Sequence, residues 1–284
     1  MDSTQSIGTG NEDEEAAKKK NILDWINHFT SIDYSSQQSR ISSRRTERTG
    51  QWFLESAEFR TWTEKNQQTM FCPGIPGAGK TFITSMVVDE LVSTSRSNKN
   101  IGVAYIYFDF RRQNEQTPAH VLLSLLEQLS RRLPSLPPVV EFLYYHHKHE
   151  ETIPPSDELS EALQSVGSMY ERVFFVIDAL DECVPDSWSL LLKLICEVQT
   201  KTRANLFATS RNIPKIAKMF QSSILLTIRA TDDDIRTYLD SRIKLPAVIR
   251  LGSDLVEDIK TEIIKSADGM YEASTFSSLK ADHS

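Results

Sequence analysis

Short apolar runs alternate with amphipathic stretches through the middle of the chain. The apolar runs lie at residues 69–72, 101–108, 173–177, 205–210 and 224–228. A run that is apolar throughout, such as residues 101–108, is typical of a strand in a sheet covered on both faces. Helical periodicity fills the intervals between the runs. The pattern predicts an α/β fold: a doubly wound, mostly parallel five-stranded sheet with helices on both faces, followed by a short C-terminal helical extension.

Capping residues and prolines mark where several helices begin. Thr117 and Pro118 suit the N-cap and first turn of a helix that reaches Leu133. Ser156 and Asp186 are expected to cap two further helices, because their side chains accept hydrogen bonds from free backbone N–H groups. These boundaries fall between predicted strands, as the crossover helices of a parallel sheet require.

The two ends of the chain differ from its middle. Residues 1–20 are polar and charged, which predicts a flexible tail. Residues 21–29 form a short amphipathic segment that could dock on the main domain or face a partner or a membrane surface. The arginine-rich stretch 40–48 is expected to be a solvated linker. Two amphipathic helices are predicted beyond residue 231, and residues 272–284 are expected to fray.

The most specific motif in the chain begins at Gly74. Residues 74–81 match the phosphate-binding pattern G-x-x-x-x-G-K-[ST] at every fixed position, between a predicted strand and a predicted helix. Glycines let the backbone approach a triphosphate, and the N–H groups of such a loop form a nest for its negative charge. Lys80 would reach the outer phosphates of ATP or GTP, and the Thr81 hydroxyl would ligate Mg²⁺. The predicted nucleotide-binding residues are Gly74, Ile75, Pro76, Gly77, Ala78, Gly79, Lys80, Thr81 and Phe82.

An acidic motif follows the third predicted strand. Asp178 comes directly after an apolar run, where an aspartate of P-loop proteins holds Mg²⁺, so we expect it to share the metal with Thr81. Ala179 is next, and Asp181 and Glu182 stand three and four positions beyond Asp178. One of these two acids is the candidate general base that orients water near the γ-phosphate, and the sequence leaves the choice between them open.

Arg211 ends the fourth predicted strand. In the predicted topology this strand lies between the strand before the phosphate loop and the strand before Asp178. The guanidinium could therefore reach the γ-phosphate and report its presence, and a surface salt bridge is the alternative. We count Arg211 with Asp181 and Glu182 as the candidate catalytic residues.

The segment before the phosphate loop has two interpretations. Residues 49–54 read Thr-Gly-Gln-Trp-Phe-Leu, and Trp62 follows near the end of a predicted helix. The Thr-Gly turn and the two tryptophans could form a pocket for a purine base, or they could pack in the core. Both interpretations stay open.

Composition narrows the classes of function. The formal net charge is −7, so no basic field favours nucleic acid. The three cysteines lie far apart, which suits a reducing compartment. No apolar run approaches the ~18 residues of a spanning helix, and the first residues lack the apolar core of a signal peptide. We expect a soluble cytoplasmic protein without a transmembrane segment that binds no nucleic acid.

Together these motifs resemble the NACHT family of signalling NTPases within the STAND class. The similarity is to the fungal type, whose module is like the N-terminal region of nephrocystin-3. It covers roughly residues 21–270, and its most specific part is the element Asp-Ala-Leu-Asp-Glu at 178–182. The matching segments are residues 49–54, 72–81, 174–182 and 208–211.

The resemblance implies a nucleotide-dependent switch that forms a homo-oligomer or engages a signalling partner, in non-self recognition or programmed cell death. It divides the chain into a polar tail with an amphipathic segment (1–45), a NACHT P-loop NTPase domain (46–230) and a partial helical extension (231–284). Arg48 departs from the family, standing where related sequences have the first Gly of a Gly-Thr-Gly turn. After Met270 the chain becomes polar, so we expect it to lack the nucleotide-locking lid of its relatives.

Two functions from different classes follow. The first is Mg²⁺-dependent binding and slow hydrolysis of ATP or GTP as a signalling switch. The second is a truncated module that acts as a non-hydrolysing nucleotide-binding or interaction adaptor. A small-molecule kinase fits less well, because such an enzyme needs neither the Asp-Ala-Leu-Asp-Glu element nor the added strand that ends in Arg211.

Overall fold

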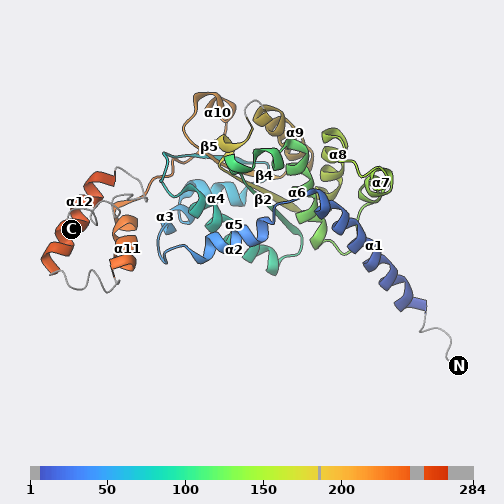
Figure 1. Ribbon diagram of the computed structural model, residues 1–284, viewed down its shortest axis with the longest axis horizontal. Helices are drawn as coiled ribbons and strands as arrows, with labels where there is room; N and C mark the ends of the chain where they lie inside the picture. Colours follow the sequence, from blue (N-terminus) through green and yellow to red (C-terminus); the bar gives the residue numbers. More distant parts are fainter. Residues whose placement is uncertain (1–6, 185–186, 244–252, 268–284) are drawn as a thin grey trace, which may run out of the picture.

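A parallel sheet forms the centre of the protein, which the computed structural model describes over residues 7–184, 187–243 and 253–267. The sheet has five strands in the order β2-β3-β4-β1-β5, and every pairing is parallel. Helices surround it (Figure 1). The predicted doubly wound α/β fold is confirmed. The strands are β1 (Thr69–Pro73), β2 (Ile101–Tyr107), β3 (Arg172–Asp178), β4 (Asn205–Ser210) and β5 (Ile224–Leu225).

Side chains alternate between the two faces of the sheet, and helices cover both faces. In β3, Val173, Phe175 and Ile177 belong to one buried cluster, whereas Phe174 and Val176 belong to the other. The first cluster includes side chains of α6 (Pro118–Arg132), α8 (Ser156–Gly167) and α9 (Ser187–Thr202). The second includes those of α3 (Gln51–Leu54), α4 (Ala57–Glu64) and α5 (Lys80–Ser97). The connections also contain η1 (Phe110–Glu115), α7 (Pro138–His147), η2 (Leu180–Glu182) and α10 (Pro214–Met219).

The fifth strand is shorter than predicted, but its chain continues beside β1. The regular pairing covers only residues 224–225 of the predicted 224–228. The N–H groups of Leu226 and Ile228 still donate to the carbonyls of Phe71 and Pro73, at 3.2 and 2.8 Å. This contact brings Ile228 to the end of β1, where the phosphate loop begins.

The helix starts agree only in part with the capping prediction. Thr117 is the N-cap of α6 and Pro118 is its first residue, as expected, although the Thr117 hydroxyl contacts the His120 ring instead of a backbone N–H. The predicted cap at Ser156 is wrong, because Pro155 holds the extended N-cap position of α8 and its carbonyl accepts the Leu159 N–H at 3.0 Å. Asp186 lies outside the described residues.

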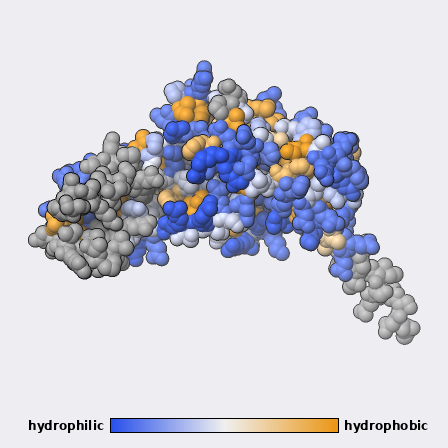
Figure 2. Space-filling model, viewed as in Figure 1, coloured by the Kyte–Doolittle hydropathy of each residue, from blue (hydrophilic) through white to orange (hydrophobic). Residues whose placement is uncertain are grey.

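The expected flexible tail is helical over most of its length. A helix, α1 (Ile7–Phe29), runs through it and extends away from the body (Figure 1). Its end nearer the body is anchored by Ile22 and Ile26, both fully buried, and the Lys18 ammonium pairs with the Glu141 carboxylate at 2.6 Å. The amphipathic segment therefore docks on the domain, while residues 13–17 farther out on the helix are exposed. The coloured surface of the domain is mostly hydrophilic on the side that Figure 2 shows.

The expected solvated linker at residues 40–48 is wrong for its first part. These residues continue a helix, α2 (Tyr34–Ser43), that packs against α5. Gln38 is buried and donates to the Ser85 carbonyl at 2.9 Å and to the Asp89 carboxylate at 2.7 Å. Arg45 pairs with the same carboxylate at 2.8 Å. A serine-rich helix is stable here because its polar side chains have partners on α5.

Two helices follow β5, as predicted. They are α11 (Asp232–Ile243) and α12 (Ser253–Ala267). Ile235 and Leu239 of α11 are buried against Ile263 and Ile264 of α12. The expected fraying of residues 272–284 falls outside the described residues. None of the helices in the described ranges is long and apolar enough to cross a membrane.

Candidate functional site

The site lies where the carboxyl ends of three neighbouring strands meet. In a parallel sheet these ends lie on one edge, so β3, β4 and β1 deliver Asp178, Arg211 and the phosphate loop to the same place. The loop runs from Gly74 into α5, whose N-cap is Gly79 at a φ of 88°. This left-handed conformation favours glycine, because a side chain would strain it.

The first glycine of the loop is required by the protein itself. A Cβ at Gly74 would lie 2.5 Å from the carbonyl oxygen of Ile228, which follows β5. From the sequence, we explained this glycine by the close approach of a phosphate to the backbone. The structure adds a second reason, because the chain after β5 already crosses the loop at that point.

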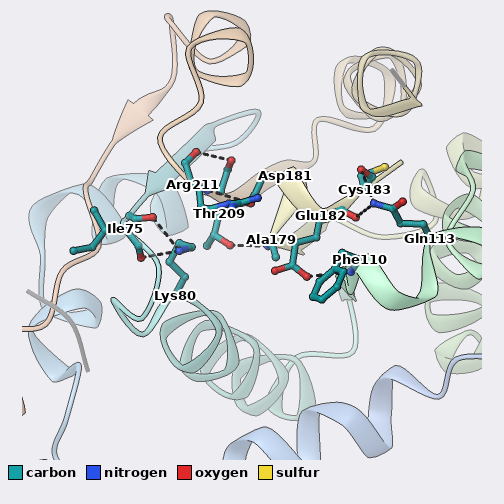
Figure 3. A network of polar contacts seen from close by, with 12 residues as sticks. Ile75, Lys80, Phe110, Gln113, Ala179, Asp181, Glu182, Cys183, Thr209 and Arg211 are labelled. Atoms are coloured by element: carbon teal, nitrogen blue, oxygen red, sulfur yellow. Dashed lines mark hydrogen bonds and ion pairs between the residues drawn. The ribbon is translucent and has the colours of Figure 1, made fainter. Parts of the chain in front are cut away.

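Lys80 lies across the phosphate loop. Its ammonium donates to the carbonyls of Gly74 and Ile75 at 2.9 and 3.0 Å (Figure 3). Burial lowers the pKa of Lys80, and the nearby carboxylates of Asp181 and Asp178 oppose that shift. The ammonium therefore lies at the loop, near Asp178 at the end of β3 and Asp181 beyond it.

Asp178 is buried at the tip of β3 and accepts three hydroxyl hydrogen bonds. They come from Thr81, Thr84 and Thr209, each at 2.7 Å. Burial raises the pKa of Asp178, and these hydroxyls partly offset the shift. The predicted metal pair, Thr81 and Asp178, is therefore in direct contact. A hydroxyl and a carboxylate are oxygen donors that suit Mg²⁺, which keeps waters and phosphate oxygens as its other ligands, so the residues fit this ion.

The two acids after Ala179 have different surroundings. The Asp181 side chain is only 2% exposed, and it accepts the Arg211 backbone N–H at 2.9 Å and the Arg211 Nε–H at 2.5 Å. Among the described residues, the Glu182 carboxylate accepts one longer bond, 3.2 Å, from the backbone N–H of Phe110. Burial raises the pKa of Glu182. Asp181 is therefore tied to Arg211, whereas Glu182 faces the cavity with a weaker contact (Figure 3).

The backbone between Asp178 and these acids turns sharply. Ala179 has a φ of 53°, and its N–H donates to the Thr209 hydroxyl at 2.9 Å. Thr209 thus bonds both the carboxylate of Asp178 and the backbone of the next residue. This double contact fixes the start of η2, and so the positions of Asp181 and Glu182.

A cavity of about 670 Å³ contains most of the predicted site. Phe110 and Gln113 of η1 also line it, and sequence reasoning missed both. The Gln113 amide donates to the Glu182 carbonyl at 3.0 Å. Only the topology could have indicated these two residues, because η1 follows β2, whose carboxyl end lies on the same edge of the sheet. The lining residues are Pro76, Gly77, Gly79, Lys80, Thr81, Phe82, Phe110, Gln113, Ala179, Asp181, Glu182 and Arg211.

A smaller cavity of about 150 Å³ adjoins the large one. Gly79 and Phe82 line both cavities. Thr49 and Gly50 line the smaller one, whereas Phe53 and Trp62 are buried in the core. Core packing is therefore confirmed for Trp62, and a purine pocket at Thr49 and Gly50 stays a prediction. The lining residues are Arg44, Arg45, Thr46, Thr49, Gly50, Gly79, Phe82, Ile83, Met86 and Tyr238.

The family described as nephrocystin 3, N-terminal, matches residues 48–211, which is more than half of the chain. The chain belongs to this family. The match runs from the turn before α3 to Arg211 and contains the phosphate loop, Asp178 and the acidic pair. The resemblance to NACHT proteins is confirmed, and the fold is that of a NACHT-like P-loop NTPase.

A curated protein with a similar sequence is the vegetative incompatibility protein HET-E-1 of Podospora anserina. The two are 24% identical over 239 residues, which covers 78% of this chain and 17% of HET-E-1. This member of the nephrocystin 3 N-terminal family therefore spans only a small part of that relative.

The likeness to one solved structure supports the fold alone. The ORC1 protein of Aeropyrum pernix, in complex with DNA, aligns with a TM-score of 0.50 at 18% identity, over 80% of this chain and 58% of that chain. AMPPCP-bound DnaA of Aquifex aeolicus gives a lower TM-score of 0.42 at 11% identity, over 81% and 60% of the two chains.

Proposed function

We propose that this protein binds a nucleoside triphosphate with Mg²⁺ and hydrolyses it slowly, as a NACHT-type signalling switch. The observation that carries the proposal is the 2.7 Å contact between the Thr81 hydroxyl and the Asp178 carboxylate, directly beside the phosphate loop. The loop motif by itself accounts for the binding of phosphate but not of a metal ion. A hydroxyl and a buried acid joined at its end add the oxygen donors for a divalent ion.

The charges around the large cavity suit a triphosphate. Lys80 and Arg211 both line the cavity, and the loop N–H groups lie at the N-terminus of α5, where the helix dipole favours an anion. On binding, Lys80 exchanges the carbonyls of Gly74 and Ile75 for phosphate oxygens. Arg211 exchanges part of its contact with Asp181 for the γ-phosphate. Bound Mg²⁺, held by Thr81 and Asp178, would neutralise charge that develops on the phosphates.

We assign the role of general base to Glu182. A base must reach the attacking water and must have a pKa near the working pH. Burial moves the pKa of Glu182 upward, in that direction, and its carboxylate lines the cavity. Asp181 fits a different role, because its carboxylate is engaged by Arg211. It positions the guanidinium that senses the γ-phosphate.

The nucleobase fits the smaller cavity. A ligand that extends from the phosphate loop past Gly79 and Phe82 enters it directly, since these residues line both cavities. Thr49 and Gly50 form one side of this space, and Arg44 and Arg45 contribute to its lining. We leave ATP and GTP as equal candidates for the ligand.

An adaptor that binds nucleotide without turnover is the second candidate. It is favoured because both carboxylates already accept hydrogen bonds: Asp181 from Arg211, and Glu182 from the Phe110 N–H. The similarity to a vegetative incompatibility protein supports a role in non-self recognition or programmed cell death for either candidate. We place the protein in the cytoplasm, with a homo-oligomer or a signalling protein as its partner.

Calorimetry with ATP and GTP, in Mg²⁺ or in chelator, followed by a phosphate-release assay, tests the proposal. We expect Mg²⁺ to strengthen binding and phosphate to appear slowly. Asp178→Ala should retain binding but lose its dependence on Mg²⁺. Binding without release would favour the adaptor, and a wild-type protein that binds neither nucleotide would contradict both candidates.

A further inference from the structure

Asp234 fastens α11 to the turn before α3. Its carboxylate accepts the backbone N–H of Gly50 at 2.8 Å through one oxygen and the indole N–H of Trp52 at 2.9 Å through the other. The residue is 5% exposed. Its own N–H bonds the Thr231 hydroxyl at 3.1 Å, which fixes the start of α11. Contacts between segments so far apart in the chain hold α11 in place.

The contact lies at the wall of the smaller cavity. Gly50, which donates to Asp234, lines that cavity. Tyr238 also lines it, and it stands four residues after Asp234 on the same helix, so the two residues lie on one face of α11. One helix therefore supplies both the carboxylate that bonds the turn and a residue that lines the cavity.

We propose that Asp234 is a positioning residue for the nucleobase. Its paired hydrogen bonds hold Tyr238 at the cavity, so base binding and docking of α11 stabilise each other. This inference rests on the proposed function, because it assumes that the base occupies the smaller cavity. Coupling of this kind is reciprocal: if a docked α11 favours the base, the base favours a docked α11 to the same extent.

A carboxylate suits this position because both groups that face it are donors. An amide of the same shape has one acceptor oxygen and one donor nitrogen, so Asp234→Asn would set an N–H against the Gly50 N–H or the Trp52 N–H. A buried donor without an acceptor weakens the contact. The neighbouring Asp233 provides a matched control: it is exposed and carries the same charge in the same turn of α11.

Two ligands separate an effect on the base from an effect on the phosphate site. Nucleoside triphosphate with Mg²⁺ contacts both cavities, whereas inorganic tripolyphosphate with Mg²⁺ has no base. We expect Asp234→Asn to weaken binding of the nucleoside triphosphate about tenfold, the scale of one unpaired buried donor. Tripolyphosphate should bind the variant and the wild type equally. Asp233→Asn should leave both affinities unchanged.

Equal loss for both ligands, or no loss for either, would overturn the inference while leaving nucleotide binding intact. A wild-type chain that binds neither ligand would instead contradict the proposed function. If Asp234→Asn does not fold, Tyr238→Ala removes the cavity wall without touching the carboxylate. The same selective loss for the nucleoside triphosphate is then expected, and its absence would count against the proposal.

The Trp52 indole N–H gives an independent measurement. Its NMR signal can be identified by its loss in Trp52→Phe. Nucleoside triphosphate should slow hydrogen exchange at this N–H in the wild type, because the bound base holds α11 docked, and tripolyphosphate should not. Equal protection by both ligands would show that the phosphate site, not the base, controls the contact.

Discussion

At the scale of single residues, Asp181 and Glu182 are neighbours in the sequence, but their carboxylates differ in their hydrogen-bond partners. The Asp181 carboxylate is fixed by Arg211 through two hydrogen bonds, and Glu182 has one longer bond to a backbone N–H. A general base contributes about 10²–10⁴-fold to a rate. Glu182→Gln should therefore retain nucleotide affinity and lower the rate of phosphate release by about that factor.

Asp181→Asn should act differently, because it loosens Arg211. We expect a weaker preference for triphosphate over diphosphate and a smaller fall in rate than in Glu182→Gln. Affinities for both nucleotides and single-turnover phosphate release measure the difference. If Asp181→Asn abolished turnover while Glu182→Gln kept it, the assignment of the base would be reversed.

The buried carboxylate of Asp178 makes stability depend on pH. Its pKa in the fold lies above its ordinary value of 3.8, because burial disfavours the charged form. As pH rises beyond that ordinary value, the unfolded chain loses this proton first, so the folded state is destabilised until the pH passes the raised pKa. Asp178→Asn removes this effect. Its free energy of unfolding in urea, relative to wild type, should increase as pH rises from about 4. A difference that stays constant with pH would contradict the shift.

Motif spacing could predict some of these residues but not others. Thr81 and Asp178 were predicted as partners because each occupies a fixed place relative to a strand, and the fold then brings their side chains together. Thr84 and Thr209 bond the same carboxylate, yet nothing in their local sequence indicates it. Phe110 and Gln113 enter the cavity only because the edge of the sheet gathers the ends of separate strands.

At the scale of elements, the departures from prediction occur where tertiary contacts decide the structure. Residues 13–17 are exposed and have no apolar period, yet they are helical, because they continue the helix that Ile22 and Ile26 anchor. Residues 34–43 are rich in serine, and their helix depends on Asp33 as its cap and on Gln38 bonding α5. Tertiary contacts of this kind override the weak preferences of the local sequence.

The turn before α3 stores strain at Arg48. Its φ is 68°, a left-handed conformation, and Gly50 two residues later has a φ of 76°. The left-handed region costs a residue with a Cβ roughly 1–2 kcal/mol. Arg48→Gly should therefore be more stable than Arg48→Ala by about 1 kcal/mol, since both lose the guanidinium and only glycine relieves the strain. Urea unfolding of the two variants tests this. Equal stability would mean that the turn relaxes without glycine.

At the scale of the whole molecule, the alternation of apolar runs and helices was sufficient to predict the sheet and the edge that carries the site. It could not predict which distant segments would close that site. The chain after β5 crosses the phosphate loop at Gly74, and Asp234 of α11 reaches back to Gly50. Such contacts follow from the packed structure and have no local pattern. As a result, the phosphate loop, the turn before α3 and α11 form one connected unit.

A ligand that binds this unit should stabilise the entire fold. Ligand at 100 times its dissociation constant adds about 2.7 kcal/mol to the free energy of unfolding. In a domain of this size, 1 kcal/mol raises Tm by roughly 2–4 °C, so Mg²⁺ with nucleoside triphosphate should raise it by roughly 5–11 °C. Thermal unfolding of the full chain measures the shift, with chelator as the metal control.

Lys80→Ala should lose most of that shift, because it removes a charge that faces the phosphates. Its unliganded Tm should stay near that of the wild type. Within the described part of the chain, the Lys80 ammonium bonds two loop carbonyls, and the residue belongs to neither of the two apolar clusters that cover the sheet. The comparison separates ligand binding from folding. A variant with an unchanged ligand-induced shift would show that the triphosphate does not sit on the phosphate loop. A variant with a much lower unliganded Tm would show instead that Lys80 holds the loop together.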